Sequence, residues 1–265
     1  MQCSPYNNTF LLKHKTCFTM DQLKTIASSI GLKHSSFKTK QPLWVKINEK
    51  MLKLDCKDSD EHCWLDVTNN NLNSHVPKRP KSWSSNPYQW LSNIDILNVL
   101  IQYEKKYKSF KFFGVFPIDF NEKYGSNQCI SKEICNIKLS KLKNYSTFAC
   151  VFNLDKHNQS GSHWVAVFFD TNKNHTNYGF YYFDSNSQPI PKEILDFGES
   201  IKKQVNDKDF IIHQNKVQKQ FNNTECGMFC IHFIVNSLKK RKFEELMNDK
   251  YYDEDVHKLR KILFR

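Results

Sequence analysis

The sequence contains no apolar stretch that approaches the ~18 consecutive residues needed to span a bilayer. Its first residues, Met-Gln-Cys-Ser-Pro-Tyr, lack the basic and then apolar pattern of a secretory signal. Internal repeats are absent as well. These absences argue against a membrane protein, a secreted protein and a repeat array, so we expect a globular intracellular protein.

Cys-x2-Cys pairs, which are common in structural zinc sites, are also missing. The nine cysteines are an odd number without a compact framework, which predicts reduced thiols. Cys56 and Cys63 lie close in sequence, as do Cys129 and Cys135, but neither pair has the further ligands that zinc needs. We therefore predict no metal site.

Positive charge is in excess. The chain has 39 Lys and Arg against 27 Asp and Glu, a formal net charge of +12, with basic runs at 78–81, 105–108 and 239–242. This excess fits either solvated lysine-rich faces or an acidic partner such as DNA. Charge alone does not choose between these two interpretations.

Residues 1–80 carry a helical signal of their own. Thr19-x-x-Gln22 is typical of a capping box, apolar residues follow at helical spacing, and Gly31 is placed to end the helix. A second short element surrounds residues 43–47. Asn-rich residues 68–75 and the prolines at 77 and 80 then predict a linker. We expect a small, mainly helical extension over 1–80 and a larger domain over 81–265.

Residues 81–265 mix helical and extended patterns. Strands are predicted at 147–153, 163–169 and 178–184, which are apolar on both faces, so helices or loops should cover both sides of their sheet. An aromatic, partly extended segment at 110–120 and a short strand at 210–212 add to them. Helices are predicted within 90–100, with Ser92 or Asn93 as the N-cap, from 191 onward, at 226–238, at 243–247 and at 255–263. This pattern predicts an α+β domain.

His163 and Asp184 are candidates for a catalytic base and the carboxylate that orients it. If residues 170–177 form the loop of an antiparallel hairpin, residue 163 lies opposite residue 184. Adjacent strands are ~4.8 Å apart, a separation that side chains bridge. The carboxylate would then fix the imidazole tautomer.

Cys226 is the candidate nucleophile, because it begins the buried helix predicted at 226–238. The helix N-terminus favours a thiolate there. The amide of Cys226 and the side chain of Gln220 are candidate oxyanion donors, and Gly227 would let a substrate backbone come close. Each residue alone is more simply a core or loop residue, but their joint occurrence favours a cysteine protease.

The chain resembles the adenain-like cysteine proteases of clan CE, which include SUMO-specific peptidases, adenovirus protease and the polyprotein protease of African swine fever virus. The resemblance spans about residues 85–265. It is carried by Gly161-Ser162-His163-Trp164, Phe183-Asp184-Ser185, Gln220 and Thr224-Glu225-Cys226-Gly227. The African swine fever virus enzyme also resembles the chain around residues 150–155 and 253–265, although it has Asn where this chain has Asp184.

The resemblance implies a catalytic triad of His163, Asp184 and Cys226, with Gln220 in the oxyanion hole. It also implies the family's fold, papain-like in the broad sense, with a central mixed sheet flanked by helices. Trp90-Leu91-Ser92-Asn93 is similar to the family's Trp-Leu-Asn-Asp signature. By that likeness Trp90 and Trp164 flank a narrow tunnel for small substrate residues such as Gly-Gly. No cofactor is implied.

The expected function is that of a viral cysteine endopeptidase, which cleaves structural polyprotein precursors at Gly-Gly-Xaa-like sites during virion maturation. Removal of SUMO or another ubiquitin-like modifier is an alternative, because it would use the same residues. A second alternative is a catalytically idle, basic nucleic-acid-binding protein of the virion. The expected partners are a protein substrate and DNA as an activator, and the expected location is the host cytoplasm, at the viral factory, and the virion.

Overall fold

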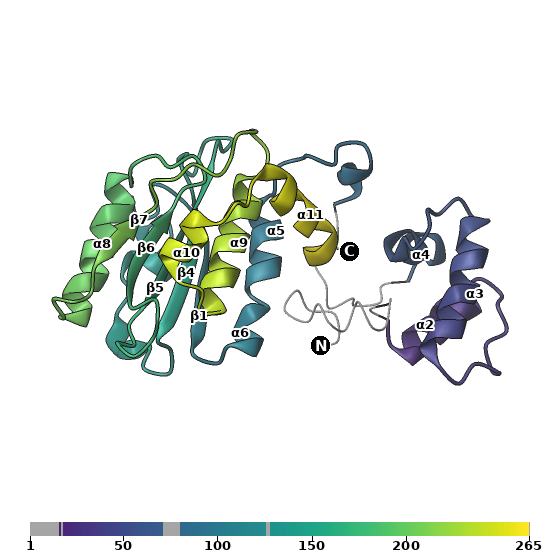
Figure 1. The fold of residues 1–265 in the computed structure, drawn as a ribbon. Helices are drawn as coiled ribbons and strands as arrows, with labels where there is room; N and C mark the ends of the chain where they lie inside the picture. Colours follow the sequence, from purple (N-terminus) through teal and green to yellow (C-terminus); the bar gives the residue numbers. More distant parts are fainter. Residues whose placement is uncertain (1–15, 17, 71–79, 126–127, 265) are drawn as a thin grey trace. The chain divides into compact units, whose positions relative to one another are not determined.

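A computed structural model describes residues 16, 18–70, 80–125 and 128–264. The chain forms two compact units, Met1–Ser84 together with Lys261–Arg265, and Ser85–Arg260 (Figure 1). Much of the predicted linker lies outside the described residues. The predicted division into an extension over 1–80 and a domain over 81–265 stays a prediction.

The first unit is helical, as expected, with α2 at Met20–Ser29, α3 at Lys40–Leu52 and α4 at Glu61–Thr68. The predicted capping box is present, because Thr19 and Gln22 each bond the backbone N–H of the other. The short element expected around residues 43–47 is a helix of 13 residues, and α4 was not predicted. The helices share a core formed by Phe18, Leu23, Ile26, Ala27, Leu43, Trp44, Ile47, Met51, Cys56, Trp64 and Leu65.

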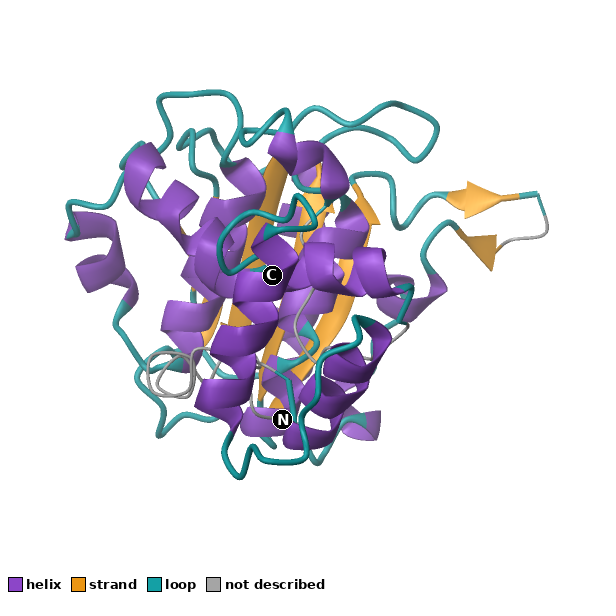
Figure 2. Cartoon of the chain, turned by 90° about the vertical axis from the view of Figure 1, so that its right-hand side faces the viewer, coloured by secondary structure: helices purple, strands orange, loops and turns teal. Residues whose placement is uncertain are grey.

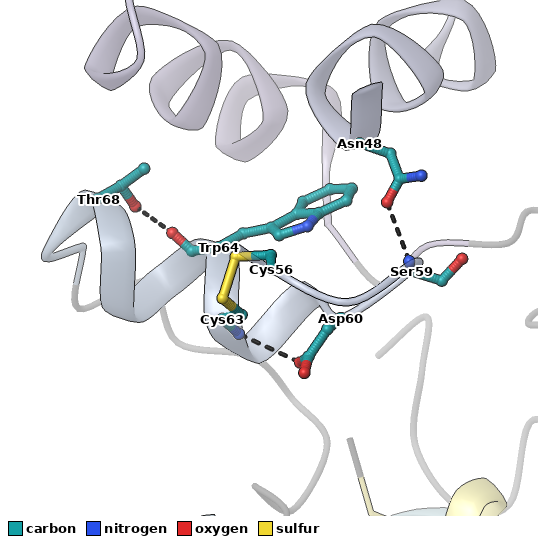
Figure 3. The surroundings of a disulfide bond; sticks show 7 residues. All are labelled: Asn48, Cys56, Ser59, Asp60, Cys63, Trp64 and Thr68. Carbon is teal, nitrogen blue, oxygen red and sulfur yellow. Dashed lines mark hydrogen bonds between the residues drawn. A yellow bond between two sulfur atoms is a disulfide. The ribbon is translucent and has the colours of Figure 1, made fainter. Parts of the chain in front are cut away.

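A disulfide joins Cys56 to Cys63 at the start of α4 (Figure 3). Asp60 caps this helix by accepting a hydrogen bond from the Cys63 backbone N–H at 3.2 Å. A second disulfide joins Cys129 to Cys135. The prediction of reduced thiols is therefore wrong for these four residues, because missing zinc ligands do not prevent two cysteines of a tight loop from pairing with each other. The free cysteines among the described residues are Cys150, Cys226 and Cys230.

The second unit contains a mixed sheet in the order β1-β4-β5-β6-β7. Neighbours β1 and β4 are parallel, β4 to β6 are successively antiparallel, and β7 is parallel to β6. The bounds are β1 Phe110–Pro117, β4 Thr147–Asn153, β5 Trp164–Asp170, β6 Gly179–Phe183 and β7 Ile212–Gln214. The three predicted long strands are thus confirmed, each within two residues at either end.

Helices cover both faces of this sheet, which explains why every residue of β5 and β6 is buried (Figures 1 and 2). Phe197 of α8 (Lys192–Val205) packs against Phe169 and Phe180 on one face. Phe233 of α9 packs on the other face against Phe168 and Phe183. The helix α9 spans Cys226–Leu238, as predicted, and all but one of its residues are buried.

The two units contain further helices and strands. They are η1 Lys81–Ser84, α5 Asn93–Leu100, α6 Tyr103–Lys106, β2 Lys123–Tyr124, β3 Gln128–Cys129, α7 Lys132–Cys135, η2 Leu139–Lys141, α10 Phe243–Asn248 and α11 Asp253–Leu263. Across the described residues, no helix is both long and apolar enough to cross a bilayer.

Candidate active site

The β5–β6 hairpin carries His163 and Asp184 just beyond its paired residues. Ala166 pairs with Phe183, and Asp170 pairs with Gly179. The predicted pairing of residue 163 with residue 184 is therefore wrong by two residues, because Asp170 belongs to the strand and not to the loop. A shift of two keeps side chains on the same face, so the predicted contact survives as a diagonal one.

His163 Nε2 lies 2.6 Å from Asp184 Oδ1, as a catalytic base and its orienting carboxylate require. Asp184 is fully buried. Its Oδ1 also accepts from the backbone N–H of Asn186 at 2.8 Å, and its Oδ2 accepts from that of Gln188 at 3.0 Å. These amides hold the carboxylate in one orientation.

Asn215 fixes the backbone of Asp184 and was missed at the sequence level. Its Oδ1 accepts from the Asp184 N–H at 2.8 Å, and its Nδ2 donates to the Asp184 carbonyl at 2.6 Å. Asn215 is 1% exposed. Its two partners belong to a residue 31 positions away, so no local sequence signal could have identified it.

Cys226 is the first residue of α9, is buried, and interacts electrostatically with the imidazole of His163. Burial would lower the pKa of His163, but hydrogen bonds with Asp184 and Cys226, and the negative charges of these groups, raise it to about 9. At neutral pH the imidazole therefore carries a proton.

Gln220 is buried, and hydrogen bonds of its side chain and backbone hold it in place. Its Oε1 accepts from Ser185 Oγ at 2.8 Å, and its Nε2 donates to the Asn222 carbonyl at 2.6 Å. Its backbone N–H donates to the Ser185 carbonyl at 3.0 Å. One hydrogen of the side-chain amide is thus committed, and the expected role of Gln220 in an oxyanion hole stays a prediction.

Trp90 and Trp164 both line a cleft of about 480 Å³ in the second unit. The Trp164 indole N–H donates to the Leu91 carbonyl at 3.0 Å, which ties the residue after His163 to the residue after Trp90. Trp164 is 9% exposed and Trp90 is 41% exposed. The two tryptophans therefore line one cleft, and the expected tunnel for small substrate residues stays a prediction.

Gly227 has a packing role in the structure. A Cβ at this position would lie 3.1 Å from the Leu91 Cβ and 3.3 Å from the Ile96 Cδ1. The glycine therefore lets α9 approach α5 and Leu91, which lies two residues before α5. The expected contact between Gly227 and a substrate backbone stays a prediction.

Glu225, which precedes the nucleophile, forms a buried ion pair with Arg260 at 2.9 Å. Its side chain does not cap α9. The sequence analysis did not identify Arg260. Within the described part of the chain, no cluster of three or more His, Cys, Asp and Glu side chains is arranged to hold a metal ion.

Comparison with known families decides the classification. Residues 117–265, more than half of the chain, match the model of the Ulp1 protease family, C-terminal catalytic domain. This chain belongs to the Ulp1 protease family. It is accordingly a cysteine-type peptidase.

Relatives of this Ulp1-family chain occur in large viruses. A protein of Acanthamoeba polyphaga mimivirus, named a thiol protease, is 28% identical over 96% of this chain and 90% of its own length. A SUMO-1 cysteine protease of African swine fever virus is 29% identical over 45% of this chain and 44% of its own length. The second match thus spans less than half of either protein.

Solved structures confirm the expected fold class. The crystal structure of the African swine fever virus protease matches with a TM-score of 0.66 at 20% identity, over 88% of this chain and 94% of that one. The C-terminal Ulp1 protease domain, solved in complex with the yeast ortholog of SUMO, matches with a TM-score of 0.51 at 15% identity, over 78% and 93%. At these identities the likeness concerns the fold.

Proposed function

We propose that this Ulp1-family peptidase is a viral cysteine endopeptidase that cleaves structural polyprotein precursors at Gly-Gly-Xaa-like sites during virion maturation. The observation that carries the proposal is the assembly of three side chains. His163 Nε2 lies 2.6 Å from Asp184 Oδ1, and the imidazole also interacts with Cys226 at the start of α9. The base, its orienter and the nucleophile thus stand in the order that acyl transfer requires.

The reaction begins when the Cys226 thiolate attacks the carbonyl carbon of the scissile peptide bond. The Gln220 amide and the Cys226 backbone N–H stabilise the resulting oxyanion. Protonated His163 gives its proton to the leaving amine, so the C–N bond breaks and a thioester remains on Cys226. Neutral His163 then takes a proton from water, which hydrolyses the thioester and restores the thiolate.

The cleft beside Trp90 and Trp164 supports a preference for small residues. We expect the two indoles that line this cleft to flank a narrow passage, which suits glycine because it has no side chain to obstruct it. A Gly-Gly segment would fit this passage better than a pair of bulky residues. It would therefore be held more readily in line for attack. Replacement of either glycine by leucine in a test peptide should therefore abolish cleavage.

A second candidate is the removal of SUMO or another ubiquitin-like modifier from conjugates. It is favoured by the fold likeness to a Ulp1 domain solved with a SUMO ortholog, and by the name of the swine fever virus relative. The two candidates differ in what binds outside the cleft. A deconjugating enzyme should turn over a whole modifier at least about 100-fold more efficiently than a free peptide with the same Gly-Gly terminus, since the folded modifier adds binding energy. Equal efficiency supports the endopeptidase.

The net charge of +12 supports DNA as an activating partner. Duplex DNA should then raise turnover at low salt, and the increase should fade as salt is added, because counterion release drives such binding. Turnover that does not respond to DNA at low salt would remove this part of the proposal. The viral relatives support action in the host cytoplasm, at the viral factory, and in the virion.

The decisive test is release of a fluorophore from a Gly-Gly-Xaa peptide. Cys226→Ala should abolish turnover and the rapid alkylation by iodoacetamide. Cys150→Ala removes another buried free cysteine, which lies in β4, and should retain both. Turnover that survives Cys226→Ala contradicts the mechanism. An inactive but well-folded wild type, with and without DNA and with both substrate classes, would favour the idle nucleic-acid-binding protein.

A further inference from the structure

The helix α11 contacts both ends of the segment 221–225, which joins Gln220 to Cys226. At the first end, Asp253 Oδ2 accepts from the backbone N–H of Phe221 at 2.8 Å and from that of Asn222 at 3.3 Å. The Asn222 carbonyl is the acceptor for the Gln220 side-chain amide. Asp253 thus determines where the acceptor lies that orients this amide.

At the other end, two turns further along α11, Arg260 holds Glu225. Its Nε donates to both carboxylate oxygens, at 3.2 and 3.0 Å, and its Nη2 lies 2.9 Å from Oε2. Arg260 is 3% exposed and Glu225 is 1% exposed. The His257 Nδ1 lies 2.9 Å from Glu225 Oε1. The residue before the nucleophile is therefore held by two side chains of one helix.

Arg260 also reaches the wall of the substrate cleft. Its Nη1 donates to the Gln89 carbonyl at 2.8 Å, and Gln89 directly precedes Trp90. The guanidinium of Arg260 thus holds two segments that are far apart in sequence, at Glu225 and at Gln89. The planar guanidinium can satisfy these acceptors at once, whereas a lysine ammonium is a single point charge.

Burying such a pair is costly, and it is weak evidence for stability. Because Glu225 directly precedes Cys226, the pair is better explained as a contact that fixes the geometry of the site. Oxyanion donors act only when they lie within hydrogen-bond distance of the developing charge, and a displacement of about 1 Å costs on the order of 100-fold in rate. A segment of five residues without helix or strand structure of its own does not supply that precision.

We propose that Asp253 and Arg260 are positioning residues, through which α11 holds segment 221–225 so that the Gln220 amide and the Cys226 backbone N–H converge on one oxyanion. This inference rests on the proposed function of these two donors. Neither α11 residue touches the reacting atoms. Their effect passes through the Asn222 carbonyl and the Glu225 carboxylate.

The test compares peptide cleavage with alkylation of Cys226 by iodoacetamide in the full chain. Cleavage forms an oxyanion, whereas alkylation is a displacement at a saturated carbon and forms none. Asp253→Ala should lower kcat by about 10- to 100-fold, as expected for a displaced oxyanion donor. The alkylation rate and its pH profile should change by less than about twofold, because the pair of His163 and Cys226 stays in place.

The matched control is Asp255→Ala, in the same first turn of α11. Asp255 accepts from the backbone N–H of Tyr252 and lies near Lys258, but contacts no residue of segment 221–225 in the described structure. Its kcat should match that of the wild type. Asp253→Asn keeps an oxygen acceptor and should recover most of the lost kcat, which also shows that the position tolerates substitution.

Arg260→Lys tests the second end. It should lower kcat and also raise KM, because the contact with the Gln89 carbonyl beside Trp90 is lost with the guanidinium. The proposal is overturned if Asp253→Ala and Asp255→Ala have equal kcat, or if alkylation falls by the same factor as kcat. Failure of the proposed function is distinguishable, since Cys226→Ala would then leave turnover intact whatever the α11 variants do.

Discussion

A single imidazole links the two halves of the candidate site. His163 forms a hydrogen bond with the buried Asp184 and interacts electrostatically with Cys226, at the start of α9. Burial opposes its charged form, and the two anionic partners more than offset this, so its pKa lies at about 9. The residue is thus set to donate a proton to a leaving amine at neutral pH.

The kcat/KM for peptide cleavage should fall as the pH rises through about 9, because His163 then loses the proton that the leaving amine needs. Alkylation of Cys226 should not fall with it, since the thiolate persists at alkaline pH. Asp184→Asn should move the fall in cleavage to lower pH, because a charge and a strong hydrogen-bond acceptor are lost. An alkaline limit that does not move would show that another group sets it.

The same pKa shift predicts a contribution to stability. The pKa of His163 is raised from the model-peptide value of 6.5 to about 9 in the folded chain, so the folded state binds this proton more tightly. The stabilisation is complete below pH 6.5 and is lost as the pH rises through about 9. Urea unfolding of wild type and His163→Ala should therefore show a difference in pH dependence within this window.

At the scale of elements, the predicted strands and the helix α9 were confirmed because their signals are local. Continuous apolar runs predict buried strands, and a long apolar segment without proline predicts a buried helix. The hairpin register was wrong by two residues, because the polar character of Asp170 placed it in the loop. In the structure Asp170 stays in β5 and bonds Thr147 and His175 there.

The contacts that complete the site could not be predicted in this way. Asn215 and Arg260 bond residues that lie 31 and 35 positions away, and neither has a distinctive sequence neighbourhood. Sequence likeness predicted the residues of the candidate triad, whereas the residues that hold them depend on tertiary packing. The helix α4 was also missed, because its N-cap residue, Asp60, lies in a polar loop of the predicted extension.

Gly227→Ala tests the close approach of α5 and α9. Alanine normally stabilises a helix relative to glycine by about 0.5–1 kcal/mol. Here the added methyl would meet the Leu91 Cβ at 3.1 Å, and overpacking of this kind costs typically about 1–3 kcal/mol. We expect a net loss of about 1 kcal/mol, read from the urea midpoint. Ser200→Ala on the exposed side of α8 serves as the control, and a gain in stability for Gly227→Ala would contradict the packing role.

At the scale of the whole molecule, the chain combines a helical unit with a mixed α+β unit, and each has a disulfide. The helical unit buries a core of its own. Its disulfide closes a short loop directly before α4 (Figure 3). Closing such a loop stabilises a fold by about 2 kcal/mol in the chain-entropy model.

The double variant Cys56→Ala/Cys63→Ala should therefore lower the stability of the first unit by about 2 kcal/mol. Limited proteolysis read by mass spectrometry should release fragments of residues 18–70 earlier than in the wild type, while peptide cleavage by the second unit persists. Cys129→Ala/Cys135→Ala is the matched control, because it removes the other disulfide and should spare residues 18–70. Equal release of these fragments from both variants would contradict the assignment.

The position of α11 in chain order has a consequence for when the peptidase becomes active. His163, Asp184, Gln220 and Cys226 all precede this helix in the sequence. During translation the ribosome therefore synthesises these four residues before α11. This is the helix that contacts segment 221–225, between Gln220 and Cys226. A nascent chain would therefore contain Cys226 before α11 has been synthesised. It would reach full turnover only after α11 has left the ribosome and folded.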